Sequence, residues 1–413
     1  MELNSDHIES LRAQFPALAK QVHGRQAVFF DGPAGTQVPQ SVIDAISCYL
    51  VNCNANGHGV FATSLESDAV IDAAHQAASD FVGSEDPGTI AFGANMTSLT
   101  FALSRALAKT WNAGDEIVLT RLEHDANFSP WRLAAEDAGV TIRYVDIDPE
   151  NCTLQLDDYA KLLTDRTKLV AVGCASNAAG TINPVKQICG WAREVGALSF
   201  LDAVHYAPHD FIDVTDWGCD FLICSAYKFF GPHVGVMYGR RELLESLQPY
   251  KLRPAPNDLP GRWMTGTQNF ECIAGTAAAI DYIANIGRLD GSTYDRRAAL
   301  KAAFYLIRRY ERQLADQLLD GLAGISEIKV WGITQVAERP HRFPTVSVTH
   351  RDMNAQTLAQ KLADAGIFCW HGNYYALPLT ERLGVEPDGM VRIGICHYNT
   401  VEEVDRLLAE LRV

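Results

Sequence analysis

The chain has 413 residues, of which 47% are hydrophobic and 21% charged, with a formal net charge of −15. This acidic balance argues against nucleic acid or an anionic membrane surface as a partner, and no apolar run in the sequence is long enough to cross a membrane. Ten cysteines without a Cys-x-x-Cys pair argue against a zinc ribbon or a small disulfide scaffold. We therefore expect a cytoplasmic protein of two domains without a metal site.

The first 288 residues contain a long alternation of strand-like and helix-like segments. Residues 1–25 predict a short amphipathic arm, and from about 65 to 285 brief apolar runs alternate with helical patterns. Strands are expected at 89–92, 116–120, 141–145, 169–174, 197–201, 221–225 and 234–239, and helices at 98–110, 131–138 and 185–195. This alternation predicts an α/β fold with a mostly parallel seven-stranded sheet and helices on both faces.

The remainder of the chain has a different pattern. Residues 246–270 begin with a proline-rich stretch that predicts a long irregular loop. Further elements are expected as a long helix at 296–322, strands at 327–331, 343–348 and 390–395, and helices at 355–365 and 400–411. The last helix opens with a capping box, Thr400 to Glu403. We expect a large domain at 26–288 and a smaller α+β domain at 289–413, against which the arm 1–25 packs.

Two charged residues stand at the ends of predicted strands. Lys228 follows the strand 221–225, and Asp202 follows the strand 197–201 and precedes His205. Each residue alone fits a solvated surface position or a turn. However, open α/β sheets bind ligands at the carboxyl ends of their strands. A lysine that forms a Schiff base, with a carboxylate that keeps a pyridine nitrogen protonated, is what a pyridoxal phosphate (PLP) enzyme requires.

Other strand ends carry groups that this cofactor could use. The segment after the strand 89–92 opens a helix at Thr97, where free amides and a hydroxyl favour a phosphate, although an N-cap alone explains the same residues. His124 follows the strand 116–120 and could lie on the ring face, and Asn177 follows the strand 169–174 and could donate to the phenolate oxygen. Four successive strands would thus end in His124, Asn177, Asp202 and Lys228, and such a placement by chance is improbable.

These residues belong to motifs that extend over nearly the whole chain. The motifs are Glu123-His124-x-Ala-Asn127, Ser176-Asn177-x-x-Gly-Thr, Asp202-x-x-His205, Ser225-x-Tyr-Lys228, Thr265-Gly-Thr267 and Val391-Arg392…Tyr398-Asn-Thr400. In this combination the sequence resembles the class V aminotransferase family of PLP-dependent fold-type I enzymes, and within it the cysteine desulfurase-like branch. The resemblance implies the PLP transferase fold.

The resemblance also implies a role for each matching residue. Lys228 would be the Schiff-base lysine and proton shuttle, Asp202 would pair with the pyridine nitrogen, and His124 would stack on the ring. The implied cofactor contacts further include Met96, Thr97, Ser225 and Tyr227 around the phosphate, and Asn177 and His205 at the phenolate oxygen. Gly266 and Thr267 match a pair that completes the phosphate site of the partner subunit, which implies a homodimer with shared active sites.

The implied substrate side of the site differs from that of the desulfurases. Arg392 matches the arginine that holds the substrate α-carboxylate, and His58, Asn373, Tyr374 and Tyr375 are the other substrate-binding candidates. In the similar desulfurases the loop matching 370–378 reads Arg-Thr-Gly-His-His-Cys-Ala-Met-Pro. Tyr375 stands where the persulfide-forming cysteine is expected, Trp370 stands where the arginine is expected, and Cys369 is six positions away.

The sequence thus predicts a PLP-dependent enzyme acting on an α-amino acid, with lyase-type β-cleavage and no persulfide chemistry. The Asp-x-x-His and Tyr-Lys patterns are similar to those of kynureninase and of epimerase-like members of class V. A class V aminotransferase, a kynureninase-like hydrolase or an epimerase therefore remains an alternative, as does a PLP-binding regulator without activity. The side chain of the substrate and the existence of a sulfur-acceptor partner stay open.

Overall fold

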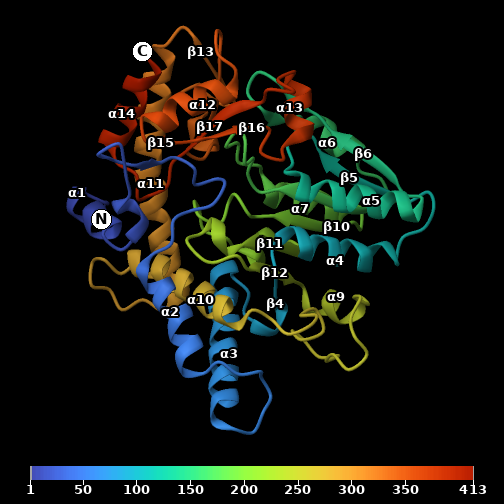
Figure 1. Cartoon of the computed structure of the whole chain (residues 1–413). Coiled ribbons are helices and arrows are strands. Elements are labelled where there is room, and N and C mark those ends of the chain that lie inside the picture. The colour runs from blue at the N-terminus through green and yellow to red at the C-terminus, as the bar shows by residue number, and fades with distance from the viewer. Residues whose placement is uncertain (1, 413) are drawn as a thin grey trace.

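A large sheet forms the centre of the computed structural model, which describes residues 2–412 (Figure 1). In spatial order its strands are β4 (Ile90–Gly93), β12 (Gly235–Gly239), β11 (Phe221–Ser225), β10 (Leu198–Asp202), β9 (Thr167–Gly173), β5 (Glu116–Thr120) and β6 (Thr141–Val145). Only β12 runs antiparallel to its neighbours within this sheet. The predicted mostly parallel seven-stranded sheet is confirmed.

Both faces of this sheet are buried under helices. The helices that follow or flank its strands are α2 (Gln40–Asn52), α3 (Ala62–Val82), α4 (Met96–Ala108), α5 (Ser129–Ala138), α6 (Leu156–Leu162), α7 (Val185–Glu194), α8 (Val214–Trp217), α9 (Arg241–Ser246) and α10 (Phe270–Ile286). On β9, Leu169 and Ala171 pack with α4 and α5, whereas Val170 and Val172 pack with α3, α7 and α10. The inner strands are therefore buried on both sides, as is typical of a parallel sheet, whereas the edge strand β6 is largely exposed.

A second sheet is built from the C-terminal third of the chain. Its strands lie in the order β13 (Ile328–Trp331), β14 (Thr345–His350), β17 (Met390–Gly394) and β16 (Trp370–Gly372), and each strand is antiparallel to its neighbours. The helices of this part are α11 (Arg296–Ala323), α12 (Ala355–Asp364), α13 (Leu377–Leu383) and α14 (Val401–Leu411). The predicted capping box is present, because Glu403 N donates to Thr400 Oγ1 and Thr400 N donates to Glu403 Oε2.

The start of the chain lies against this C-terminal part. In α1 (Ser5–Arg12), Arg12 pairs with Glu403 at 2.7 Å. β3 (Val28–Phe29) pairs in parallel with β15 (Ile367–Phe368). Short hairpins join β1 (Gln21–Val22) to β2 (Arg25–Gln26) and β7 (Ile147–Asp148) to β8 (Thr153–Leu154). The domain boundaries at 25/26 and 288/289 stay predictions.

Some elements were not expected from the sequence. The 21-residue α3 buries Ser64, Ser67 and His75 beside its alanines, so its buried face has no clear apolar period. The segment 247–269 is irregular as predicted. Within residues 2–412, no helix combines the length and apolar character needed to cross a membrane.

Gly180 allows the turn after β9 to pack closely against the backbone at the start of β14. Gly180 has φ +74°, and a Cβ on it would lie 2.7 Å from Thr345 O and 2.8 Å from Phe343 O. We expect Gly180→Ala to lower the free energy of unfolding by about 2–3 kcal/mol, because both the left-handed backbone and the backbone clash are costly.

Gly291 is a matched control for this substitution. It has φ +81° and no atom within 4 Å of its added Cβ, so Gly291→Ala isolates the conformational cost of about 1 kcal/mol. Urea denaturation of the two variants measures the difference. Equal losses of stability would show that the packing of Gly180 on β14 is unimportant.

Candidate functional site

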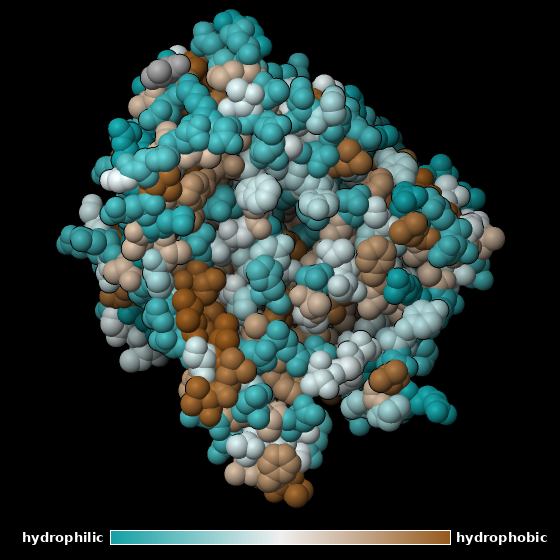
Figure 2. All heavy atoms as spheres, viewed as in Figure 1, coloured by the Kyte–Doolittle hydropathy of each residue, from teal (hydrophilic) through white to brown (hydrophobic). Residues whose placement is uncertain are grey.

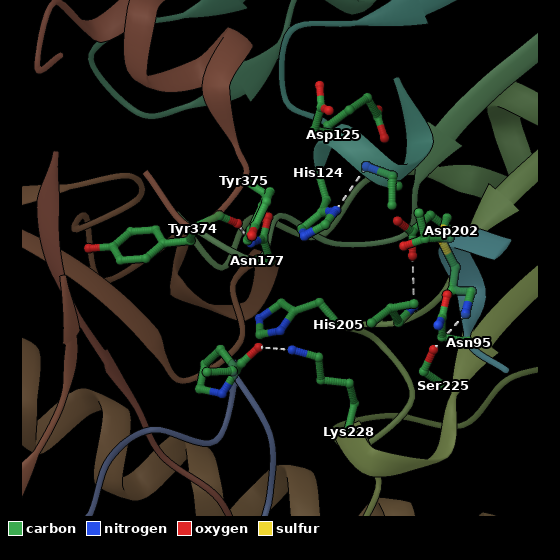
Figure 3. A pocket seen from close by; sticks show the side chains of 18 of the residues that line it. Asn95, His124, Asp125, Asn177, Asp202, His205, Ser225, Lys228, Tyr374 and Tyr375 are labelled. Atoms are coloured by element: carbon green, nitrogen blue, oxygen red, sulfur yellow. Dashed lines mark hydrogen bonds between the residues drawn. The ribbon is translucent and has the colours of Figure 1, made fainter. Parts of the chain in front are cut away.

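A cavity of about 1010 Å³ opens at the carboxyl ends of the large-sheet strands (Figure 3). It is lined by the residues that follow β4, β5, β9, β10 and β11, and by the segment 370–375 and Arg392 of the C-terminal sheet. The two sheets thus meet across it. Open α/β sheets bind ligands at this edge.

The cavity brings together most of the residues predicted from the sequence. The predicted residues that line it are Met96, Thr97, His124, Asn177, Asp202, His205, Ser225, Tyr227, Lys228, Asn373, Tyr374, Tyr375 and Arg392. His58, Gly266 and Thr267 lie elsewhere, in exposed segments. Within one chain, these three residues therefore do not contribute to the cavity.

The start of α4 forms one end of the cavity. Asn95 caps the helix, because its side chain accepts a hydrogen bond from Ser98 N at 2.9 Å. Ser225 at the end of β11 accepts a hydrogen bond from Met96 N at 3.0 Å. Thr97 is exposed at this helix N-terminus, where amides and hydroxyl groups favour an anion.

Asp202 and Lys228 are the two charged groups at the centre. Asp202 is 6% exposed and accepts a hydrogen bond from Val204 N at 2.8 Å. Burial raises the pKa of Asp202 to about 6 although that hydrogen bond and Lys228 oppose the shift. The Lys228 amine donates to Pro33 O, and burial together with the Arg392 charge lowers the pKa of Lys228 to about 7. Near neutral pH, Asp202 is therefore mostly ionised, and Lys228 is partly a free amine.

His124 lies beside these groups in a neutral form. Its Nδ1 accepts a hydrogen bond from Ala126 N at 3.0 Å, which leaves the ring hydrogen on Nε2. Burial and the charges of Lys228 and Arg392 lower the pKa of His124 to about 3. The ring of Tyr375 lies above it at a centroid distance of 5.6 Å and an angle of 32°. One face of the imidazole is thus already occupied.

Glu123 is a cavity residue that the sequence did not single out as part of the site. It is 1% exposed and accepts hydrogen bonds of 2.6 Å from both Thr120 and Asn127. Burial raises the pKa of Glu123 to about 8, so it is mostly protonated at neutral pH. The Glu123-His124-x-Ala-Asn127 motif was a signal that could have identified it, because Asn127 is one of the partners of Glu123.

Arg392 is held at the other end of the cavity by neutral groups. Its Nη1 donates to Asn177 O at 2.9 Å, and its guanidinium carbon lies 4.3 Å from the centre of the Tyr374 ring. Asn177 donates in turn to Tyr374 O at 3.0 Å. Arg392 is 4% exposed, and burial lowers its pKa to about 10, so it stays charged. No carboxylate among residues 2–412 forms a salt bridge with it.

Comparison with known proteins assigns the family. The family model described as aminotransferase class-V matches residues 28–407. A cysteine desulfurase of Synechococcus elongatus is 33% identical over 98% of the chain, which spans 63% of that relative's length. A cysteine desulfurase of Pectobacterium atrosepticum is 31% identical over 98% of the chain and 97% of the relative.

The solved structures agree with these relatives. The apo structure of a cysteine desulfurase from Thermococcus onnurineus matches with a TM-score of 0.87 and 26% identity, over 98% of this chain and 97% of that one. A cysteine desulfurase from Escherichia coli has the same fold, with a TM-score of 0.84 at 24% identity over 100% of this chain and 98% of that one. The chain belongs to the class V aminotransferase family.

This class V protein is a PLP-dependent enzyme, and its cavity fits that cofactor. The amides and hydroxyl groups at the start of α4 suit a phosphate. Asp202 offers a buried carboxylate for a pyridinium, and Lys228 offers an amine of lowered pKa for an aldehyde. Asn177 differs from the expectation that it donates to the phenolate oxygen, because its Nδ2 donates to Tyr374 O and the atom left without a hydrogen-bond partner in the described part of the chain is the acceptor Oδ1.

No cysteine of the class V chain contributes to this cavity. Its lining contains none of the ten cysteines in the sequence. Cys369 is partly packed against the core of the C-terminal sheet, and burial raises the pKa of its thiol. A thiol held in this state is a poor nucleophile.

The lowered pKa of Lys228 predicts the pH dependence of cofactor capture. Only the neutral amine attacks an aldehyde, and it predominates above the pKa. Since that pKa lies at about 7, the rate of PLP capture by the cofactor-free protein should rise with pH through about 7, well below the ordinary lysine value of about 10.4. Stopped-flow absorbance measures the rate, and borohydride reduction with peptide mapping locates the bond.

The variant Lys228→Ala provides the background for this measurement, because it retains the surface lysines. It should show slow capture with a midpoint near that of an ordinary lysine. A wild-type midpoint near pH 10 would contradict the assignment of a desolvated amine at this position.

Proposed function

We propose that this enzyme acts on an α-amino acid and cleaves a bond at its β-carbon without forming a protein persulfide. The observation that carries the proposal is a buried cation, Arg392, which opens into the same cavity as Lys228 and forms no salt bridge in residues 2–412, although the charge of Asp31 acts on it from beyond ion-pair distance. A buried charge without a partner is costly, so an anionic ligand group compensates it. A substrate α-carboxylate matches the geometry of a guanidinium.

Lys228, Asp202 and His124 would carry out the proton transfer and hold the cofactor. When bound, PLP supplies an electron sink for negative charge on the substrate α-carbon. Lys228, with a pKa of about 7, can accept the α-proton near neutral pH and return it. Asp202, anionic above about pH 6, keeps the pyridine nitrogen positively charged. His124 is neutral and can pack against the ring without repelling that charge.

The loop 373–376 supports a reaction without sulfur transfer to the protein. Tyr375 is 72% exposed, and its backbone N donates to Asn373 Oδ1 at 3.1 Å. Asp125 N donates to Tyr375 O at 2.6 Å, so the loop is fixed over His124. A phenol cannot hold sulfur as a persulfide, and no cysteine lines the cavity. β-Elimination needs only the lysine and the cofactor.

An exposed apolar surface supports the proposed homodimer. The helices α2 and α3 and the segment between them expose Ile43, Leu50, Val51, Val60, Phe61 and Leu65, and hydrophobic side chains gather along α2 in Figure 2. Exposed apolar patches commonly mark an interface. His58 and the Gly266-Thr267 pair, which lie outside their own cavity, would in such a dimer be available to the cavity of the partner.

Arg392→Lys tests the carboxylate site. A lysine retains the charge but loses the two-pronged contact, so we expect KM for an amino-acid substrate to rise about 10-fold or more with a smaller change in kcat. Lys329→Arg, an exposed position on the same sheet, is the control and should leave both unchanged. Equal activity of the wild type on an amino acid and its decarboxylated amine would show that Arg392 does not bind the substrate.

Product analysis separates the proposed reaction from its alternatives. With cysteine or another amino acid that has a β-leaving group, we expect an α-keto acid and ammonia, and no protein-bound sulfur. Mass spectrometry of the protein detects a persulfide, and the carbon product is identified by chromatography. Alanine with stoichiometric persulfide would overturn the proposal. Transfer of the amino group to a keto acid, hydrolysis of a β-keto side chain, or racemised substrate would instead support a transaminase, a kynureninase-like hydrolase or an epimerase.

A further inference from the structure

His205 bridges the two sheets of the molecule. It follows β10, lines the cavity and is 5% exposed. In Figure 3 its ring lies between the side chains of Asn177 and Lys228. Its Nε2 lies 3.1 Å from Oγ1 of Thr345, which is fully buried at the start of β14. The contact thus joins a cavity residue of the large sheet to a hydroxyl group of the C-terminal sheet.

The other hydrogen bonds of Thr345 indicate whether Thr345 Oγ1 or His205 Nε2 is the donor in this contact. The Thr345 hydroxyl has one partner among residues 2–412, His205 Nε2. Other groups satisfy the Thr345 backbone, since its N donates to Phe343 O and its O accepts from Arg342. A buried hydroxyl donates its hydrogen wherever an acceptor is in reach. Here the acceptor is Nε2, so the hydrogen of a neutral imidazole must reside on Nδ1.

The surroundings keep this imidazole neutral. Burial and the nearby charges of Lys228 and Arg392 hold the pKa of His205 well below its ordinary value, and His209 acts in the same direction. His209 itself is bound through Nδ1 to the buried carboxylate of Glu311 at 2.8 Å. The rings of His205 and His209 meet edge to face at 5.3 Å without a hydrogen bond. Thr345 is therefore the only side chain in the described residues that bonds the His205 ring.

We propose that Thr345 is a positioning residue that fixes His205 in the tautomer with its hydrogen on Nδ1, so that the ring presents a donor to the cavity. The one side-chain hydrogen bond of His205 among residues 2–412 is made by Nε2, and the residue lines the cavity. On the proposed function, on which this inference rests, the acceptor is the phenolate oxygen of PLP. A donor there stabilises negative charge, whereas the other tautomer would direct a lone pair at that oxygen and repel it.

The tautomer can be measured directly on the full-length protein. We expect ¹⁵N-histidine NMR of the wild type to show a protonated Nδ1 and an unprotonated Nε2 for His205, assigned by comparison with His205→Gln. Thr345→Val removes the donor at nearly constant volume and should yield a mixture of tautomers in the cofactor-free protein. Thr345→Ser restores the hydroxyl and should restore the single tautomer.

Thr276→Val is the matched control. Thr276 is fully buried in α10, and its hydroxyl donates to Cys272 O within the same helix. This variant also loses a buried threonine hydroxyl but should leave the His205 signals unchanged. A wild-type His205 with its hydrogen on Nε2, or an unchanged single tautomer in Thr345→Val, would overturn the proposal.

The cofactor provides a second readout. Loss of a donor to the phenolate should raise the pH midpoint of the visible absorption change of bound PLP by about half to one pH unit in Thr345→Val, and Thr345→Ser should restore it. In a His205→Ala background, Thr345→Val should cause no further shift, because the two residues act as one unit. An equal shift in that background would mean that Thr345 acts by another route.

The two readouts separate this inference from the proposed function. Absence of any Lys228-dependent absorption would refute the cofactor site but leave the NMR result interpretable. Normal absorption in the wild type with an unshifted midpoint in Thr345→Val would refute the role of Thr345 and leave the cofactor site intact.

Discussion

The burial of Lys228 within reach of a second cation, Arg392, is the constraint on which the rest of the site depends. Burial and this repulsion bring the pKa of Lys228 down to about 7, which makes it both a nucleophile and a proton acceptor near neutral pH. Burial, reinforced by this pair of charges, lowers the pKa of His124 and His205 and keeps both rings neutral. Asp202 is the one anion that favours a charged Lys228. The cavity is thus suited to ligands that bring negative charge, namely a phosphate, a phenolate and a carboxylate.

The sequence predicted the large sheet well because its signals are local. The runs that form β5 and β11 are largely apolar and buried, and their predicted bounds, like those of the more polar edge strand β6, agree with the structure. The polar residues at the carboxyl ends of the parallel strands β5, β9, β10 and β11 must lie at one edge of the sheet. His124, Asn177, Asp202 and Lys228 could therefore be placed in one cavity without knowledge of the tertiary structure.

The rest of the site depends on contacts between distant segments, which local patterns do not encode. Pro33 O receives the Lys228 amine across 195 residues, and Thr345 meets His205 across 140. The latter contact follows from the register of β14 with β17, in which Thr345 pairs with Gly394 and Ser347 with Arg392. A threonine in a strand carries no sign of such a role. Helices α2 and α3 were not predicted either, because polar or small residues interrupt their apolar faces.

The turn that carries Asn177 is the point at which the two sheets are joined. Arg392 donates to Asn177 O, Ser347 to Ala178 O, and Arg342 to Ala179 O, at 2.7–2.9 Å. Gly180 then lets the turn pack on the backbone of Thr345. The C-terminal sheet cannot move away from this turn without breaking these hydrogen bonds and leaving three buried donors, two of them cationic, without those acceptors, at a cost of several kcal/mol. Arg392 and His205, both bonded to groups at this junction, are therefore held in one rigid unit.

The rim of the cavity is built from aromatic side chains. Trp370 is 53% exposed and Tyr375 is 72% exposed, and both line the cavity.

Tyr374 and Tyr375 have φ of +54° and +59°, a conformation that costs bulky residues about 1–2 kcal/mol each. Four hydrogen bonds offset that cost: Asn177 to Tyr374 O, Tyr374 OH to Met390 O, Tyr375 N to Asn373, and Asp125 N to Tyr375 O. A strained loop so tightly held places its two phenol rings in fixed positions, one against Arg392 and the other against His124. The aromatic loop therefore shapes the rim of the cavity that Asp202, Lys228 and Arg392 also line.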